Sequence, residues 1–145
     1  MTRVDFYVLK AGTAQQRAVF ACRLAEKAYG QGFGIYIHTG SAAETSRIDE
    51  LLWTFRDGSF LPHLTVEEAE RTDPDQCTPV LLGHGQSPGA QDGLLINLAG
   101  EVPTFFSRFQ RVAEIVGGDD ADRQWARDRF RFYRDRGYEL KTHNI

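Results

Sequence analysis

The chain has 145 residues, of which 41% are hydrophobic and 26% charged, and its formal net charge is −3. This balance is typical of one globular domain and excludes disordered, fibrous and polycationic nucleic-acid-coating proteins. Two cysteines, Cys22 and Cys77, are too few for a disulfide framework. No apolar run approaches the roughly 20 residues that span a bilayer, and Asp5 stands where a secretory signal needs apolar residues. We therefore expect a cytoplasmic protein with no membrane segment.

In chain order, the first half alternates strands with helices. Residues 4–9 are β-branched and aromatic, which predicts a strand. Residues 14–29 place apolar side chains at three- and four-residue steps, which predicts a helix. A second strand is predicted over residues 34–39, and residues 41–57 follow as a helix that opens with a serine–glutamate capping box.

The second half predicts two more strands and two more helices. Residues 67–79 are acidic and contain proline, which indicates a loop. The apolar runs 80–82 and 94–98 predict buried strands. Residues 104–116 carry phenylalanine and valine at helical spacing, and residues 119–136 begin with two aspartates that suit a helix N-terminus. The order predicts an α/β fold with an open, mostly parallel sheet flanked by helices.

The usual signatures of enzyme chemistry are missing from the sequence. The turn at residues 10–14 has one glycine and neither of the glycine-rich patterns that bind phosphate. The chain has four histidines: His38, His63, His84 and His143. None has a histidine or cysteine at the spacing of a helical metal site, and no serine lies in a nucleophile elbow. We expect no cofactor, no metal and no catalytic site.

The last predicted helix has an unusual charge. Residues 123–136 contain six arginines and two acids, a net charge of +4, so the remaining residues sum to −7. Guanidinium groups bind carboxylates and phosphates bidentately. At helical spacing one ridge carries Arg123, Arg127, Arg131 and Arg134, with Phe130 beside it. The expected inner side carries Ala121, Trp125, Ala126 and Phe132, with Tyr133 near its border.

Three interpretations of this helix remain open from the residues alone. The first is a solvated amphipathic helix whose arginines pair with neighbouring acids. The second is a site for an anionic partner that also has an apolar anchor. The third is a nucleic-acid site, for which a single +4 helix on an acidic domain is a weak signature.

Two aromatic residues form a second candidate site. Trp53 lies about 100° around the helix from the core-facing Leu52, and Phe60 follows the turn after this helix. An exposed tryptophan and phenylalanine are typical anchors for another protein chain. The alternative, that both residues cover the edge of the core, is equally compatible with the spacing.

These features belong to an ordered set of segments. The segments are Val4–Leu9, Ile48–Trp53, Ser59–His63, Pro79–Val80, Leu94–Leu98 and Ala126–Tyr138. In this order they resemble the chi subunit family of bacterial DNA polymerase III holoenzyme, and the resemblance covers essentially the whole chain, residues 1–145, as one domain. It implies a non-catalytic adaptor with a Rossmann-like fold that lacks a nucleotide-binding loop.

The resemblance also implies a first partner. One face of chi-like proteins captures the acidic C-terminal tail of single-stranded DNA-binding protein (SSB), which ends in an aromatic residue and its free carboxylate. The matching positions are Arg123 and Arg127 for the acidic groups, Phe130 for the apolar wall and Arg134 as a further basic contact. Arg123 and Phe130 depart from the lysine and tyrosine of the best-known members, which keeps the charge and the ring but removes a hydroxyl group.

A second partner is implied for the two aromatic residues Trp53 and Phe60. Trp53 and Phe60 match the positions that bind the psi subunit, which tethers chi to the clamp loader. The expected function is therefore a link between the clamp loader and SSB-coated DNA, with DNA contacted only through SSB. The alternative is a small α/β enzyme that uses the terminal arginines as a clamp for a nucleotide or phosphate ligand, against which the missing phosphate loop argues.

Overall fold

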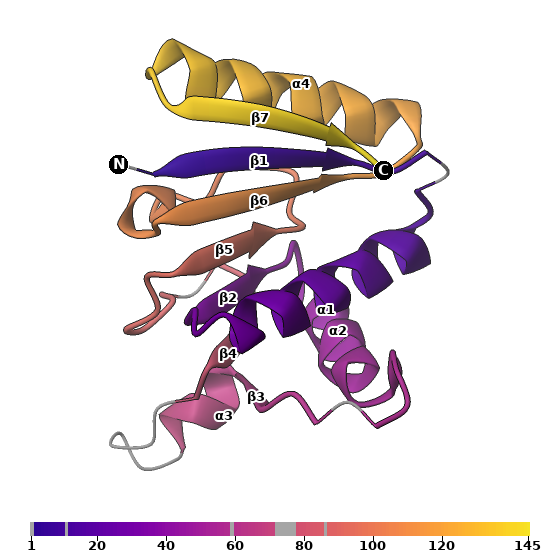
Figure 1. The fold of residues 1–145 in the computed structure, drawn as a ribbon, viewed down its shortest axis with the longest axis vertical. Coiled ribbons are helices and arrows are strands. Elements are labelled where there is room, and N and C mark those ends of the chain that lie inside the picture. The colour runs from indigo at the N-terminus through magenta and orange to yellow at the C-terminus, as the bar shows by residue number, and fades with distance from the viewer. Residues whose placement is uncertain (1, 11, 59, 72–77, 86) are drawn as a thin grey trace.

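The computed structural model describes residues 2–10, 12–58, 60–71, 78–85 and 87–145. Within these residues, seven strands form a sheet in the order β3-β4-β2-β5-β6-β1-β7 (Figure 1), and every paired neighbour is parallel. The strands are β1 (Arg3–Val8), β2 (Ile35–His38), β3 (His63–Thr65), β4 (Val80–Gly83), β5 (Leu94–Asn97), β6 (Arg111–Val116) and β7 (Glu139–Asn144). The predicted α/β fold is confirmed, with a sheet that is wholly parallel.

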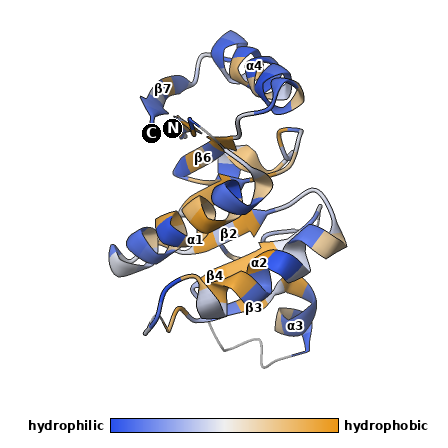
Figure 2. Ribbon diagram, turned by 90° about the vertical axis from the view of Figure 1, so that its right-hand side faces the viewer, coloured by the Kyte–Doolittle hydropathy of each residue, from blue (hydrophilic) through white to orange (hydrophobic). Residues whose placement is uncertain are grey.

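Helices cover both faces of this sheet. They are α1 (Ala14–Gly30), α2 (Ala42–Thr54), α3 (Val66–Glu70) and α4 (Asp120–Asp135), with a short 3-10 helix, η1, at Phe106–Arg108. Helices α1 and α2 pack on one face and α4 on the other (Figures 1 and 2). None of the helices in the described ranges is both long and apolar enough to cross a membrane.

The central strands are buried on both sides. In β2, Ile35 and Ile37 pack into the core under α1 and α2, whereas Tyr36 between them packs into the core on the α4 side. All four residues of β2 and all four of β5 are buried. Strands with two covered faces have continuous apolar sequences, and this is why the runs at 80–82 and 94–98 predict their strands correctly.

The predicted helix starts are present, with one change in detail. Thr13 and Gln16 form a reciprocal capping box at α1. At α2 the Ser41 hydroxyl accepts from the Glu44 N–H, but the Glu44 carboxylate accepts from the N–H of Gly40 at 3.4 Å. The helix ends at Thr54, three residues earlier than predicted.

The helix predicted over residues 104–116 is wrong. This segment forms η1 and then β6, which lies between β5 and β1. Val112, Ile115 and Val116 are β-branched and therefore favour a strand, and five of the six β6 residues are buried. The three- and four-residue spacing of phenylalanine and valine mimics a helical face, but its first half lies in the 3-10 turn.

Three short elements, β3, α3 and β7, are missing from the prediction. Strand β7 is an edge strand in which only Leu140 and His143 are partly buried, so it lacks a strong apolar alternation. Helix α3 begins at Val66, one residue before the predicted loop at 67–79, after a capping box between Thr65 and Glu68, and extends into that loop. Residues 72–77 of that loop, including Cys77, lie outside the described residues.

Candidate functional site

Helix α4 buries a face that is partly charged. Its buried residues are Asp122, Ala126, Arg129 and Tyr133. The predicted inner face is therefore wrong for Trp125, whose side chain is 54% exposed, and for Ala121, which is also exposed. The prediction placed Trp125 on the inner face because it is hydrophobic. In the structure Arg129 takes an inner position instead, because the sheet beneath the helix carries a buried carboxylate that needs a cationic partner.

That carboxylate is Glu114 on β6. Arg129 donates from Nε to Glu114 Oε1 at 2.9 Å, and the Tyr133 hydroxyl donates to Oε2 at 2.7 Å. Asn97 Nδ2 donates to the same group at 3.0 Å. Burial raises the pKa of Glu114, and the Arg129 charge and the donors from Asn97 and Tyr133 oppose that rise. The positive charge of Arg129 is thus neutralised inside the protein and is withdrawn from the surface of α4.

A pocket of about 230 Å³ opens between α4 and the end of the sheet that carries β1 and β7. Its lining residues are Phe6, Val8, Val116, Arg123, Ala126, Arg127, Phe130 and Thr142. We call it the arginine pocket. Its walls are mainly apolar, and the Phe130 ring meets Phe6 edge to face at 5.4 Å between centroids.

The arginine pocket contains three of the four residues that the sequence assigns to an acidic tail. Arg123, Arg127 and Phe130 all line it. Arg134 follows Phe130 by one turn of the helix and does not line the pocket; its Nη2 lies 3.3 Å from the carboxylate of Asp135. The sequence interpretation therefore corresponds to one concave site, with Arg134 outside it.

The arginines of α4 differ in whether an acid compensates them. Arg131 and Arg134 have aspartate partners at 3.9 and 3.3 Å, as the solvated-helix interpretation expects. Arg123 and Arg127 have no carboxylate within 4.0 Å in the described part of the chain, and Arg127 Nη1 contacts only Gln124 Oε1, at 3.5 Å. The rim of an apolar pocket thus carries two uncompensated positive charges, which suits a ligand with both an apolar group and a carboxylate.

Trp53 and Phe60 lie elsewhere on the molecule. Trp53 is 59% exposed at the end of α2, on the face of the sheet opposite to α4, and Phe60 is 85% exposed in the segment that follows. The Trp53 ring packs on His63, with 4.4 Å between the ring centroids. Both aromatics are thus largely exposed, although Trp53 also covers the buried His63 of the edge strand β3.

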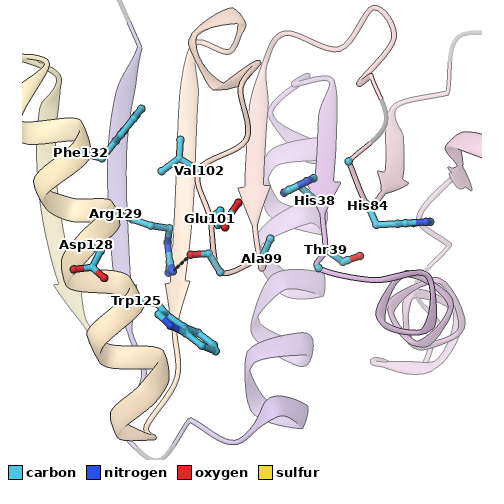
Figure 3. A pocket seen from close by; sticks show the side chains of 13 residues that line it. His38, Thr39, His84, Ala99, Glu101, Val102, Trp125, Asp128, Arg129 and Phe132 are labelled. Atoms are coloured by element: carbon cyan, nitrogen blue, oxygen red, sulfur yellow. Dashed lines mark hydrogen bonds between the residues drawn. The ribbon is translucent and has the colours of Figure 1, made fainter.

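The carboxyl ends of the central strands border a larger cavity of about 850 Å³, which we call the carboxyl-edge cleft (Figure 3). Residues at or just after the ends of β2, β4 and β5 form its floor, and α4 forms a wall. The residues that line the cleft include His38, Thr39, His84, Gly100, Glu101, Trp125, Asp128, Arg129 and Phe132. Sequence reasoning missed this cleft. The sequence does contain a signal for it, because polar residues and glycine directly follow three of the predicted strands, where the ligand sites of parallel sheets lie.

His38 is neutral in the wall of this cleft. Asn97 Nδ2 donates to Glu114, so Asn97 Oδ1 accepts from His38 Nδ1 at 3.0 Å. Burial lowers the pKa of His38, although the hydrogen bond with Asn97 opposes this change. The ring therefore keeps its proton on Nδ1 and leaves Nε2 as an acceptor.

The glycine in the turn after β1 makes a close backbone contact. The carbonyl oxygen of Gly12, in the turn after β1, accepts from the Gly118 N–H at 2.8 Å. A Cβ atom on Gly12 would lie 2.8 Å from the Cα of Gly117, so this turn packs directly against the segment after β6. Gly12 is therefore used for a close backbone contact within the fold, and the segment lacks the spaced glycines of a phosphate-binding loop.

The described residues offer neither a metal site nor a reactive thiol. No three histidine, cysteine, aspartate or glutamate residues within them are grouped to hold a metal ion. Cys22 is fully buried on α1, and burial raises the pKa of its thiol to about 12.

Comparison with known proteins identifies the family. The family described as "DNA polymerase III chi subunit, HolC" matches residues 1–141. The chain is 48% identical over 145 residues to DNA polymerase III subunit chi of Pseudomonas aeruginosa, and the match covers 100% of this chain and 98% of the relative. The Escherichia coli subunit is 29% identical over 147 residues, with 98% of this chain and 97% of the relative covered.

Among solved structures, the crystal structure of T4 UvsW shares the fold. The TM-score is 0.68 with 10% sequence identity, and the match covers 99% of this chain and 42% of that longer one. This likeness concerns the architecture alone, whereas the sequence matches extend over the full length of the chi subunits. The chain therefore belongs to the DNA polymerase III chi subunit family, as its sequence segments indicate.

Proposed function

We propose that this chi-family chain is an adaptor that captures the acidic C-terminal tail of SSB in the arginine pocket and connects it to the polymerase III holoenzyme. Family membership makes the chain a non-catalytic accessory subunit of DNA polymerase III. The proposal adds the partner and the site.

The observation that carries the proposal is the combination of charge and shape at the arginine pocket. Arg123 and Arg127 stand unpaired at the rim of a pocket of about 230 Å³ whose walls include Phe6, Val8 and Phe130. A peptide that ends in an aromatic residue brings a ring for the interior and a carboxylate for the guanidinium groups at the same position. Acidic residues upstream in the tail then extend along the ridge toward Arg134.

The proposed interface with the psi subunit is supported by the exposure of Trp53 and Phe60. Trp53 and Phe60 are large aromatic side chains that are 59% and 85% exposed. Trp53 lies on α2, on the opposite side of the sheet from α4, and Phe60 lies in the segment that follows. We assign them to the psi subunit of the clamp loader. Because the two faces are separated by the sheet, the chain can hold SSB and psi at once, which is what a link between them requires.

A titration of a labelled SSB C-terminal peptide, followed by fluorescence anisotropy, tests the proposal. Saturable binding is expected at micromolar concentration, and the same peptide without its terminal aromatic residue should not bind. No saturation up to about 100 μM would remove the tail-capture function. In the same assay, bare single-stranded DNA should bind far more weakly than SSB-coated DNA, because the surface of the domain is acidic overall.

A further inference from the structure

Helix α4 has a second concave side, which the proposed function does not use. The arginine pocket lies along Arg123 and Arg127, whereas the carboxyl-edge cleft lies along Trp125, Asp128 and Phe132 (Figure 3). At 100° per residue, Trp125 and Arg127 point about 160° apart around the helix axis. The two cavities therefore face different solvent regions and can be occupied independently.

The charge of the cleft is opposite to that of the arginine pocket. Glu101 and Asp128 line it, and Glu101 has no cation within 4.0 Å in the described ranges. Asp128 has only the exposed Arg131, at 3.9 Å, and such a pair contributes little in solvent. Arg129 adds no net positive charge, because Glu114 lies 2.9 Å from it. The cleft is thus suited to a cation and repels phosphate and acidic peptides.

Two aromatic rings in the cleft differ in whether a cation covers them. The Cζ atom of Arg136 lies 3.6 Å from the centroid of the Phe132 ring, so one ring already stacks with a guanidinium of the chain itself. Trp125 is 54% exposed, and no cation of the described residues stacks on it. Tryptophan is the ring that attracts cations most strongly, and nearby carboxylates add to that attraction.

The occupant must supply a cation that matches these charges. Arg129 does not supply it, because this side chain is 3% exposed and its Nη1 donates to the carbonyl of Gly100 at 3.1 Å. An arginine side chain offers a planar guanidinium that stacks on an indole and binds carboxylates bidentately, which a lysine ammonium does not. We propose that the carboxyl-edge cleft binds an arginine-bearing segment of a partner protein, with the guanidinium stacked on Trp125 and paired with Glu101 and Asp128.

Amide NMR spectra test this site with a defined probe. The peptide Ac-Gly-Arg-Gly-Arg-Gly-NH2 should shift the indole N–H of Trp125 and the amides of Gly40 and Gly100 saturably, at about millimolar concentration. The matched peptide with glutamine in place of arginine should leave these signals in place. The double variant Glu101→Gln/Asp128→Asn should weaken binding by at least about fivefold.

A matched control lies on the same helix. Asp135→Asn removes an exposed acid that does not line the cleft, so its affinity for the arginine peptide should equal that of the parent. Equal shifts with the glutamine peptide, or an unchanged affinity in the double variant, would overturn the proposal. Oligothymidine that shifts the same signals would identify a nucleobase site instead and would also overturn it.

The result is separable from tail capture. The double variant keeps Arg123 and Arg127 and should bind the SSB peptide as the parent does. The SSB peptide should shift the signals around Phe130 and leave the Trp125 indole signal unchanged. The experiment can therefore contradict one of the two proposed sites without contradicting the other. A thermal melt of Trp125→Phe checks that changes in the cleft leave the fold intact, and its weakened arginine binding gives a second measure of stacking.

Discussion

Arg129 and Glu114 form an ion pair of 2.9 Å in which the side chains are 3% and 0% exposed. The pair links α4 to β6, and Arg129 also lines the carboxyl-edge cleft. Because both side chains are buried, either charge without its partner would lack both a counter-charge and solvent to stabilise it.

We therefore expect Glu114→Gln to reduce the free energy of unfolding by about 3–5 kcal/mol, because Arg129 stays buried without its counter-charge. Urea denaturation at neutral pH measures the change. The double variant Glu114→Leu/Arg129→Met should recover part of the loss. A loss below about 1 kcal/mol in Glu114→Gln would contradict the role given to this pair.

Arg127→Ala should weaken binding of the SSB peptide by about 2 kcal/mol, or about 30-fold, because it removes an uncompensated guanidinium from the lining of the pocket and with it a charge-assisted contact. Arg131→Ala is the matched control, since Arg131 lies on the same helix but pairs with Asp128 and does not line the pocket. Anisotropy titrations of both variants give the comparison. Equal losses would show that only the overall charge of α4 matters.

Phe130 should act through its ring. Phe130→Tyr keeps the contact with Phe6 and should bind the peptide within about threefold of the parent, whereas Phe130→Ala opens the wall and should lose about tenfold or more. Peptide titrations, with melting temperatures as a check on folding, distinguish these outcomes. An alanine variant that is folded and binds normally would remove Phe130 from the site.

Trp53→Ala and Phe60→Ala should leave SSB-peptide affinity within about twofold, because neither residue lines the arginine pocket. Both should weaken capture of a psi subunit, which a pull-down with purified psi measures. Loss of peptide binding in a folded Trp53→Ala protein would refute the separation of the two faces.

Stability at acid pH should depend on Asp5. Burial acts to raise the pKa of this carboxyl, but the hydrogen bond from His143 at 2.9 Å and the charges of Arg3 and Arg111 lower it overall. The folded state therefore favours the ionised form. The resulting stability is present above the unfolded pKa, near pH 4, and is lost as the pH falls through the lower folded value.

Denaturation curves at pH 7 and pH 3 should show this loss in the parent protein and a smaller one in Asp5→Asn. The variant should also be about 1–3 kcal/mol less stable at pH 7, because three cationic or donor groups lose their carboxylate. A parent protein with the same stability at both pH values would contradict the shift.

The sequence predicts the elements that its local patterns specify. Strands β1, β2, β4 and β5 and helices α1, α2 and α4 follow from apolar runs, helical spacing and caps. What it misses depends on distant partners. Strand β7 is a strand because β1, more than 100 residues earlier, offers it an edge. Likewise, β6 is a strand because β1 and β5 enclose it on both sides.

The candidate site divides in the same way. Spacing on one helix groups Phe130 with a ridge of Arg123, Arg127, Arg131 and Arg134, and the family resemblance selects the candidate tail-binding residues. The structure adds the apolar walls that β1 and β6 supply. The sequence does not distinguish Arg129 from the other arginines of α4, because the burial of Arg129 depends on its ion pair with Glu114, 15 positions earlier. Glu114 lies on β6, a strand whose apolar spacing predicts a helix instead. The carboxyl-edge cleft could not be predicted either, because its lining residues come together only when the order of three strands in the sheet is known.

The position of β1 between β6 and β7 has a consequence for biosynthesis. The arginine pocket combines Phe6 and Val8, on β1, with Val116, Arg127 and Thr142, which the ribosome adds more than 100 residues later. A nascent chain therefore lacks most of the pocket until β6, α4 and β7 have been made. We expect a product truncated before α4 to lack the pocket and, with it, the proposed affinity for the SSB tail.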